Sequence, residues 1–318
     1  MGDQHIATIS SRDLENLINI LEVKFVALSQ CSVSSGYALE LGGVDAPGIH
    51  YNLMGKGFVI FGNDLLVELV PDTLVIVPAN TSFRIGATTP GGDGKRLKSV
   101  DGRSQTAIND GVRKFVAGYG DPEIILFCGY FHATYGVSTD LFANLSMPIV
   151  EGFTREDRLD TRLREAMDEL VAQELGAGAM SATLLKQLIV LLLRRSLSSP
   201  EIWALRFPLY SDGEIARVFS RLVAHPAAEH TIESLAREAH LSRSAFMQRF
   251  TSAIGRPPMS VLRDLRMRQA VQQLMAGLLS IDEVVRNAGY ESRSSFGRAF
   301  KKLYGCGPAD FKPGGQTD

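Results

Sequence analysis

This chain of 318 residues has few cysteines, no long apolar run and almost no net charge. Its three cysteines, Cys31, Cys128 and Cys306, lie far apart with no Cys-x-x-Cys pair, which excludes a disulfide framework and a zinc-binding pattern. The most apolar stretch, 184–193, is interrupted by polar side chains and is too short to span the roughly 30 Å of a bilayer. Residues 1–16 carry charges and no apolar signal-peptide core. We therefore expect a cytoplasmic protein with no membrane partner.

The near-zero net charge conceals two halves of opposite sign. The whole chain has 33 Lys+Arg and 35 Asp+Glu, a net charge of -2. Residues 210–318 hold 15 basic and 11 acidic side chains, whereas residues 1–209 hold 18 and 24. A basic excess confined to one segment is typical of a nucleic-acid-binding domain. The length allows two domains, and 45% apolar residues indicate a globular chain.

The amino-terminal part has the pattern of short strands. Runs rich in β-branched residues are separated by turn residues, which predicts a β-sandwich or jelly-roll barrel. The runs lie at 58–61, 65–70, 74–77 and 124–127. A polar, glycine-rich and basic loop is expected over 88–109. Helical spacing takes over after residue 152, with one helix beginning near Thr154 and another over 182–196. The second is apolar on nearly every side, so we expect it to pack against its neighbour and a partner subunit.

An internal repeat is the strongest signal in the sequence. The segment Ser242-Arg243-Ser244-Ala245-Phe246 with Phe250, Gly255 and Pro258 recurs 50 residues later as Ser292-Arg293-Ser294-Ser295-Phe296 with Phe300, Gly305 and Pro308. Upstream positions match at an offset of 49, so a one-residue slip falls in the turn before each serine. Each copy reads as helix, tight turn and helix. Thr231 and Ser242 are expected N-caps in the first copy.

The second helix of each copy carries the candidate DNA-binding residues. Phe246 and Phe250 share one face and should anchor the first of these helices, which leaves a polar face directed outward. The candidates are Arg243, Ser244, Met247 and Gln248 in the first copy, and Arg293, Ser294, Ser295, Arg298, Lys301 and Lys302 in the second. Arginine and glutamine suit base edges in the major groove, and two such helices in one domain would enter successive grooves. The competing interpretation is a helical repeat with solvated charges.

These motifs resemble the AraC/XylS family of bacterial transcription regulators. The resemblance covers about 211–312 and is carried by the segments 231–239, 242–246, 255–258, 266–270, 281–284, 289–292 and 296–301. It implies a seven-helix module of two helix-turn-helix units joined by a long helix, here about 259–275. It also implies base-reading positions at Ser244, Met247 and Gln248, and at Ser294, Ser295 and Arg298. Val285 stands where the family usually has alanine.

The strand-rich segment resembles the cupin-type sensor domain of the same family, on the motif at 70–80. A cupin enzyme needs a His-x-His pair, a carboxylate and a further histidine. Here Tyr51 and Asn52 follow His50, and Phe83 and Arg84 stand where the last histidine is expected. We therefore expect a binding barrel with no metal and no cofactor, in which His50 is a hydrogen-bonded structural residue. The protein is not expected to be an enzyme.

Candidate effector-binding groups are cationic. They are Arg84, the loop cations Lys95, Arg96, Lys98 and Arg103, and the pair Arg158 and Arg162. Clustered cations suit a carboxylate or phosphate ligand, although a solvated loop has the same composition. The Arg-x-x-x-Arg spacing of the pair resembles the arginine motif of cyclic dinucleotide receptors. Interleaved acidic residues could instead form ion pairs with it.

The sequence thus predicts a homodimeric transcription regulator that binds double-stranded DNA under control of a small, anionic effector. The expected divisions are a cupin-like effector domain over 1–150, a helical dimerisation segment over 151–209 and a DNA-binding domain over 210–318. Two alternatives stay open at this point. One is a metal-dependent cupin enzyme with a DNA-binding tail. The other is a DNA-repair protein with a cysteine alkyl acceptor, which requires an activated thiol.

Overall fold

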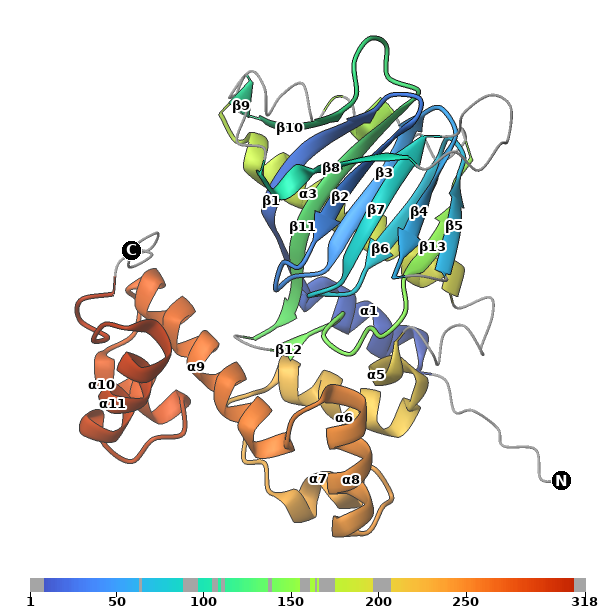
Figure 1. Ribbon diagram of the computed structural model, residues 1–318. Helices are drawn as coiled ribbons and strands as arrows, with labels where there is room; N and C mark the ends of the chain where they lie inside the picture. Colours follow the sequence, from blue (N-terminus) through green and yellow to red (C-terminus); the bar gives the residue numbers. More distant parts are fainter. Residues whose placement is uncertain are drawn as a thin grey trace, which may run out of the picture. The chain divides into compact units, whose positions relative to one another are not determined.

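The structure is a computed structural model that describes residues 9–62, 65–87, 97–104, 108–109, 112–136, 139–154, 161–163, 165, 175–196 and 207–311. The chain divides into two compact units (Figure 1). One unit comprises 22–133 and 142–198, and contains the β-barrel. The other comprises 1–21, 134–141 and 199–318, and contains the predicted helix-turn-helix segments. We call them the barrel unit and the helical unit.

The strands form two sheets, which lie in the barrel unit except for β12 and the last two residues of β11. The larger has the order β13-β6-β3-β11-β1-β10-β9, with β12 paired to the end of β11, and the smaller has the order β5-β4-β7-β2-β8. The larger sheet contains β1 (Glu22–Val33), β3 (Gly48–Met54), β6 (Thr73–Val77), β9 (Ile108–Asn109), β10 (Val112–Ala117), β11 (Ile124–Tyr135), β12 (Thr139–Asp140) and β13 (Ile149–Gly152). The smaller contains β2 (Tyr37–Gly42), β4 (Gly57–Phe61), β5 (Leu65–Leu69), β7 (Ser82–Ala87) and β8 (Lys98–Asp101).

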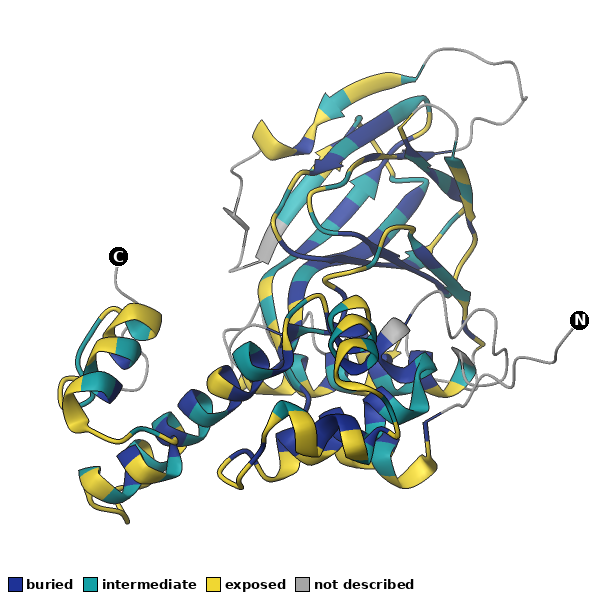
Figure 2. Cartoon of the chain, turned by 90° about the horizontal axis from the view of Figure 1, so that it is seen from below, coloured by how far each residue is buried: buried dark blue, intermediate teal, exposed yellow. Residues whose placement is uncertain are grey.

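The strands form where β-branched and apolar residues alternate or run together. All five residues of β6 are buried, whereas β5 and β7 alternate buried and more exposed positions. Figure 2 shows buried and more exposed positions alternating along strands of the barrel. An alternating strand has one face on the core and one toward water. The inner faces meet in one apolar cluster that includes Cys31, Leu39, Val75, Phe83 and Cys128. A 20-residue helix, α3 (Ala177–Ser196), packs on β1.

The helical unit contains α1 (Ser11–Ile20), α5 (Pro208–Ser211), α6 (Gly213–Ala224), α7 (Ile232–Glu238), α8 (Arg243–Ile254), α9 (Pro258–Ala276), α10 (Ile281–Asn287) and α11 (Arg293–Tyr304). Helix α1 packs on α6, with Leu14 and Leu17 buried. Helix α9 leads from the first helix pair, α7 and α8, to the second pair, α10 and α11 (Figure 1). No helix among the described residues is both long and apolar enough to cross a bilayer.

The predicted fold class is confirmed: a β-rich cupin region with helices precedes an all-helical helix-turn-helix region. The prediction of a loop over 88–109 is wrong in part, because Lys98–Asp101 forms strand β8, which pairs in parallel with β2. The first turns of the helix predicted to begin near Thr154 would occupy 155–160, which lie outside the described residues. Helix α3 begins earlier than predicted, at Ala177.

Candidate nucleic-acid interface

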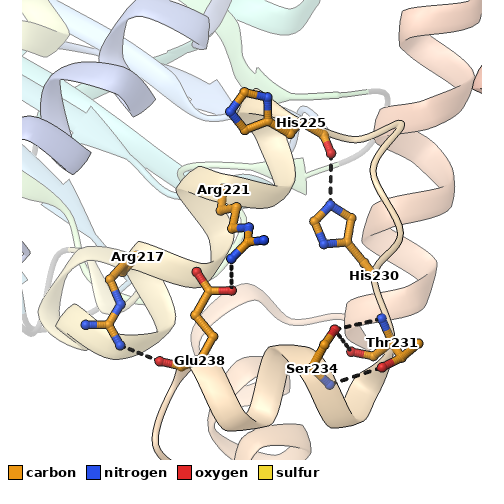
Figure 3. Close-up of polar contacts among 7 residues, drawn as sticks. All are labelled: Arg217, Arg221, His225, His230, Thr231, Ser234 and Glu238. Carbon is orange, nitrogen blue, oxygen red and sulfur yellow. Dashed lines mark hydrogen bonds and ion pairs between the residues drawn. The ribbon is translucent and has the colours of Figure 1, made fainter.

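Both helix pairs begin with side-chain caps, as the repeat predicts. Thr231 and Ser234 form a reciprocal capping box at the start of α7, with both backbone-to-hydroxyl distances 3.0 Å (Figure 3). Ser280 and Glu283 form the corresponding box at α10. The hydroxyl of Ser242 accepts a hydrogen bond from the backbone N–H of Ala245 at 3.3 Å to start α8. These contacts satisfy backbone donors that the first turn of a helix leaves unpaired.

The tight turns use a left-handed residue at equivalent positions. His240 follows α7 with φ +54°, and Gly289 follows α10 with φ +74°. A histidine in this region carries a steric cost that glycine avoids. The predicted slip is also confirmed, because α8 begins five residues after the end of α7, and α11 begins six after the end of α10.

Buried phenylalanines fix the orientation of the two recognition helices. Phe246 and Phe250 are fully buried on α8, with ring centroids 5.5 Å apart. Phe296 and Phe300 repeat this arrangement on α11, also with centroids 5.5 Å apart. Because residues four apart share a helix face, the opposite face of each helix is directed outward. Val285, the departure from the family pattern, is buried in the core of the second pair.

The predicted DNA-binding residues lie on these outward faces. Those exposed are Arg243, Ser244, Gln248, Arg293, Ser294, Arg298, Lys301 and Lys302. Met247 and Ser295 are half-buried. The Ser295 hydroxyl contacts the Ser292 hydroxyl at 2.9 Å, and its backbone N–H donates to the same hydroxyl, so this side chain takes part in the cap. Within the described part of the chain, Gln248, Arg298, Lys301 and Lys302 make no side-chain hydrogen bond or ion pair.

The first arginine of each recognition helix is held by a carboxylate on the preceding helix. Arg243 lies 3.1 Å from Glu233, and Arg293 makes a two-pronged contact with Asp282 at 2.5 and 2.6 Å. The Arg293 guanidinium lowers the pKa of the Asp282 carboxyl. The two ion pairs therefore occupy equivalent positions of the repeat.

Several further arginines, which sequence reasoning missed, hold the helical unit together. Arg249 binds Asp212 with both prongs at 2.8 and 2.7 Å, and Arg256 lies 2.5 Å from Asp264. Arg221 pairs with Glu238 at 2.9 Å (Figure 3). Only part of the basic excess is therefore available to DNA. The N-cap position of Asp212 was readable from the sequence, but its arginine partner, 37 residues away, was not.

Of the predicted effector-binding residues, Arg84 and Arg103 line one groove, and Arg162 lines another. Arg84 is exposed on β7, on the outer face of the smaller sheet, where an open groove of about 390 Å³ is also lined by Glu40 and Arg103. Arg103 is paired with Asp101 at 2.9 Å. Lys95, Arg96 and Arg158 lie outside the described residues. These positions therefore stay predictions.

Arg162 lies beside helix α3. Its guanidinium donates to the side-chain oxygen of Gln187 at 3.1 Å. The two residues line an open groove of about 440 Å³ together with Thr183, Lys186, Val190, Leu191 and Arg194. Partial burial lowers the pKa of Lys186, opposed by the nearby charge of Glu22. The groove therefore combines cationic groups with an apolar floor.

His50 is buried, but it is not the hydrogen-bonded histidine that we expected. It is 1% exposed, and neither ring nitrogen has a hydrogen-bond partner among the described residues. Its ring centroid lies 4.8 Å from that of Phe83. Burial lowers its pKa from 6.5 to about 3, so the imidazole is neutral at physiological pH. The expectation was wrong because the neighbours of this position are apolar: Val75 of β6 and Cys128 of β11 pair with it, and Phe83 of β7 contacts its ring.

The barrel interior does not fit a cupin metal centre. Asn52, two residues after His50, uses its amide to hold the following turn: it donates to the Gly55 carbonyl at 2.9 Å and accepts from the Met54 backbone N–H at 3.2 Å. Phe83 supplies a ring where a histidine would be needed. Among the described residues no three His, Cys, Asp or Glu side chains are grouped to hold a metal ion. Burial also raises the pKa of the Cys128 thiol, the reverse of activation.

Comparison with known proteins identifies two regions of the chain. Residues 14–198 match the family described as "Cupin", and residues 235–313 match the family described as "Helix-turn-helix domain". The chain is 27% identical over 310 residues to a putative AraC-like transcription regulator of Streptomyces lividans, covering 94% of this chain and 97% of that one. A similar protein of Streptomyces antibioticus is 23% identical over 307 residues, with the same coverage.

Two partial matches concern the DNA-binding region. The RCS-specific HTH-type transcriptional activator RclR of Escherichia coli (strain K12) is 35% identical over 98 residues, which are 31% of this chain and 34% of that protein. The solved DNA-binding domain of AdpA in complex with a target DNA has 32% identity and a TM-score of 0.28, covering 30% of this chain and 85% of that one. With a cupin match over more than half of its length, followed by the helix-turn-helix match, the chain belongs to the AraC/XylS family of DNA-binding transcription regulators rather than to the cupin enzymes.

Proposed function

We propose that α8 and α11 enter successive major grooves of one operator, about 34 Å apart, and that Gln248 and Arg298 make the decisive base contacts. The observation that carries this proposal is the repeated geometry: two capped helices, each anchored by two buried phenylalanines, with an exposed polar face. Gln248 and Arg298 carry side chains able to form paired hydrogen bonds with base edges. Lys301 and Lys302, near the end of α11, are assigned to phosphate contacts.

Affinity measurements with substituted proteins and DNA test these assignments. The operator is first selected from a random DNA pool with the full-length protein. Arg298→Ala and Gln248→Ala should each weaken specific binding by about 1–3 kcal/mol and relax preference at one base position. Lys302→Ala is the contrast, because it should weaken binding to all sequences alike. It should also reduce by about 1 the slope of the logarithm of the binding constant against the logarithm of the salt concentration. Unchanged affinity and base preference in both recognition-helix variants would show that the assigned face is wrong.

We also propose that the cupin domain binds a small anionic effector in the groove along α3. Support comes from the cationic groups Arg162, Lys186 and Arg194 around Val190 and Leu191. Cations placed over an apolar floor suit a carboxylate or phosphate joined to an apolar or planar body, which includes cyclic dinucleotides. The second candidate location is the groove at Arg84.

Thermal-shift measurements on the full chain distinguish the two grooves. The ligands are a panel of dicarboxylates, nucleotides and cyclic dinucleotides. A ligand at 100 times its Kd should add about 2.7 kcal/mol to stability. Arg162→Ala should abolish this stabilisation and Arg84→Ala should preserve it. The opposite result would move the effector to the smaller sheet, and loss in neither variant would remove both grooves from consideration.

The protein is further proposed to be a homodimer that associates through α3. Most leucines of this helix are buried against its own barrel unit, whereas Met180, which does not line the groove, is 58% exposed. Sedimentation of Met180→Glu should show a monomer with unchanged circular dichroism. A folded variant that still sediments as a dimer would place the interface on another surface.

A further inference from the structure

A chain of buried aromatic rings joins the end of a barrel strand to the first recognition helix. Tyr135 is the last residue of β11 and is 1% exposed. Its ring meets Phe219 of α6 edge-on, with centroids 5.2 Å apart. Phe219 lies 6.4 Å from Phe250 of α8, which lies 5.5 Å from Phe246. We call Tyr135, Phe219, Phe250 and Phe246 the aromatic chain.

Further contacts hold Tyr135 in this position. Its hydroxyl is hydrogen-bonded to that of Tyr210 on α5, and burial raises the pKa of both phenols, so both stay protonated. Gly136, which follows with φ +69°, leaves no room for a side chain, because an added Cβ would lie 3.0 Å from the Leu265 side chain of α9. The end of β11 is thus packed against three helices of the helical unit.

Among the described residues, the core behind the second recognition helix takes no side chain from β11. This core consists of residues between Met267 and Phe311, with aromatic contacts among Tyr290, Phe296, Phe300, Tyr304 and Phe311. The core behind α8, by contrast, takes Tyr135 from a segment 75 residues before Tyr210. The earlier residues Ile124, Leu126 and Cys128 of β11 belong to the barrel core, whereas Tyr135, at its end, belongs to the helical unit.

We propose that Tyr135 is a positioning residue for DNA recognition: its ring, acting through Phe219 and Phe250, fixes the pose of α8 and leaves that of α11 unaffected. The proposal rests on the assignment of α8 as a base-reading helix. The physical reason is that packed cores are nearly incompressible, so removing one ring lets the next one shift. A small displacement of a recognition helix disturbs paired hydrogen bonds with base edges far more than contacts with phosphates.

Base discrimination at the two half-sites tests the proposal. The full-length protein is used with its selected operator and with two variants of that operator. One variant is changed at a base read by α8, and the other at a base read by α11. In Tyr135→Ala, discrimination at the α8 base should fall by about tenfold, the equivalent of a single mismatch, whereas discrimination at the α11 base should stay within about twofold. General destabilisation would reduce the fraction of active protein. It would leave unchanged, at both half-sites, the ratio of the affinities for the original and the altered operator. Equal loss at both half-sites, or no loss at either, would overturn the proposal.

Matched variants separate the ring contact from other effects. Tyr135→Phe keeps the ring and should retain wild-type discrimination. Phe131→Ala removes an equally buried ring from the same strand, one that packs on Phe142 in the barrel unit, and should leave both ratios unchanged. If Tyr135→Ala does not fold, Tyr135→Leu replaces it with the same expectation. Gln248→Ala must lose discrimination at the α8 base; if it does not, the assignment of α8 has failed rather than the role of Tyr135.

Discussion

Replacing His50 by leucine should remove one defined contribution to the acid sensitivity of the barrel. The imidazole is 1% exposed, lies against Phe83, and has no hydrogen-bond partner for either nitrogen among the described residues. Its pKa is lowered from 6.5 to about 3 by burial. Between these values the unfolded chain binds a proton that the folded chain does not. Stability therefore falls as the pH falls from 6.5 toward 3.

The size of the effect follows from the shift. Each unit of pH below 6.5 costs about 1.4 kcal/mol, so the barrel loses about 3 kcal/mol between pH 6.5 and pH 4.5 through this one group. That is a large part of the stability of an ordinary domain. In His50→Leu this contribution disappears. The variant should also gain about 1 kcal/mol at pH 7, because two buried polar atoms without partners are removed.

Thiol labelling under urea measures the stability of the barrel alone. Cys31 and Cys128 are buried in its core, so a small aromatic disulfide that reacts at acidic pH labels them only when the barrel opens. Cys306 is first replaced by serine to remove its background. The control is His132→Leu, which changes an exposed histidine of β11. In this variant the stability of the barrel should depend on pH as it does in the wild type. If wild type and His50→Leu show the same dependence on pH, the burial argument is refuted.

Three further substitutions test the helical unit by urea unfolding followed through its amide exchange. His240→Gly should stabilise the first helix pair by about 1 kcal/mol, because glycine adopts φ +54° without steric cost; a loss would mean that the imidazole makes a favourable contact. Phe300→Ala, which removes a fully buried ring, should destabilise the second pair by about 3–5 kcal/mol, and a cost below about 1 kcal/mol would contradict the packing described. Ser280→Ala should cost about 1 kcal/mol by removing the cap of α10, with Ser252→Ala, an exposed serine within α8, as the neutral comparison.

The two helix-turn-helix units could be predicted in detail because their signals are local. A cap such as that of Ser242 joins atoms three residues apart, and the anchoring phenylalanines lie four residues apart on one helix. The repeat also places equivalent residues in equivalent turns, so the outward faces of α8 and α11 follow from spacing alone. The barrel strands were predictable for a similar reason, although β8 was hidden in a polar segment whose pairing with β2 depends on strand order.

The basic side chains show where this reasoning stops. Composition indicates that the carboxyl-terminal segment is basic, but it does not distinguish Arg249, which binds Asp212, from Arg298, which faces outward. Both are arginines on predicted helices, and neither has a carboxylate within six residues in the sequence. Their roles separate only when a partner from another helix comes within 3 Å.

The local pattern of residues was thus sufficient to indicate the family, the β-rich and all-helical regions, and the outward faces of α8 and α11, because helix periodicity, capping and strand alternation are short-range properties. Tertiary packing alone decided three other features: that His50 is buried without a hydrogen bond, that the arginines divide into structural and exposed groups, and that Tyr135 of the barrel strand lies behind α8. Each depends on contacts between segments distant in the chain, whose partners are chosen by the fold as a whole.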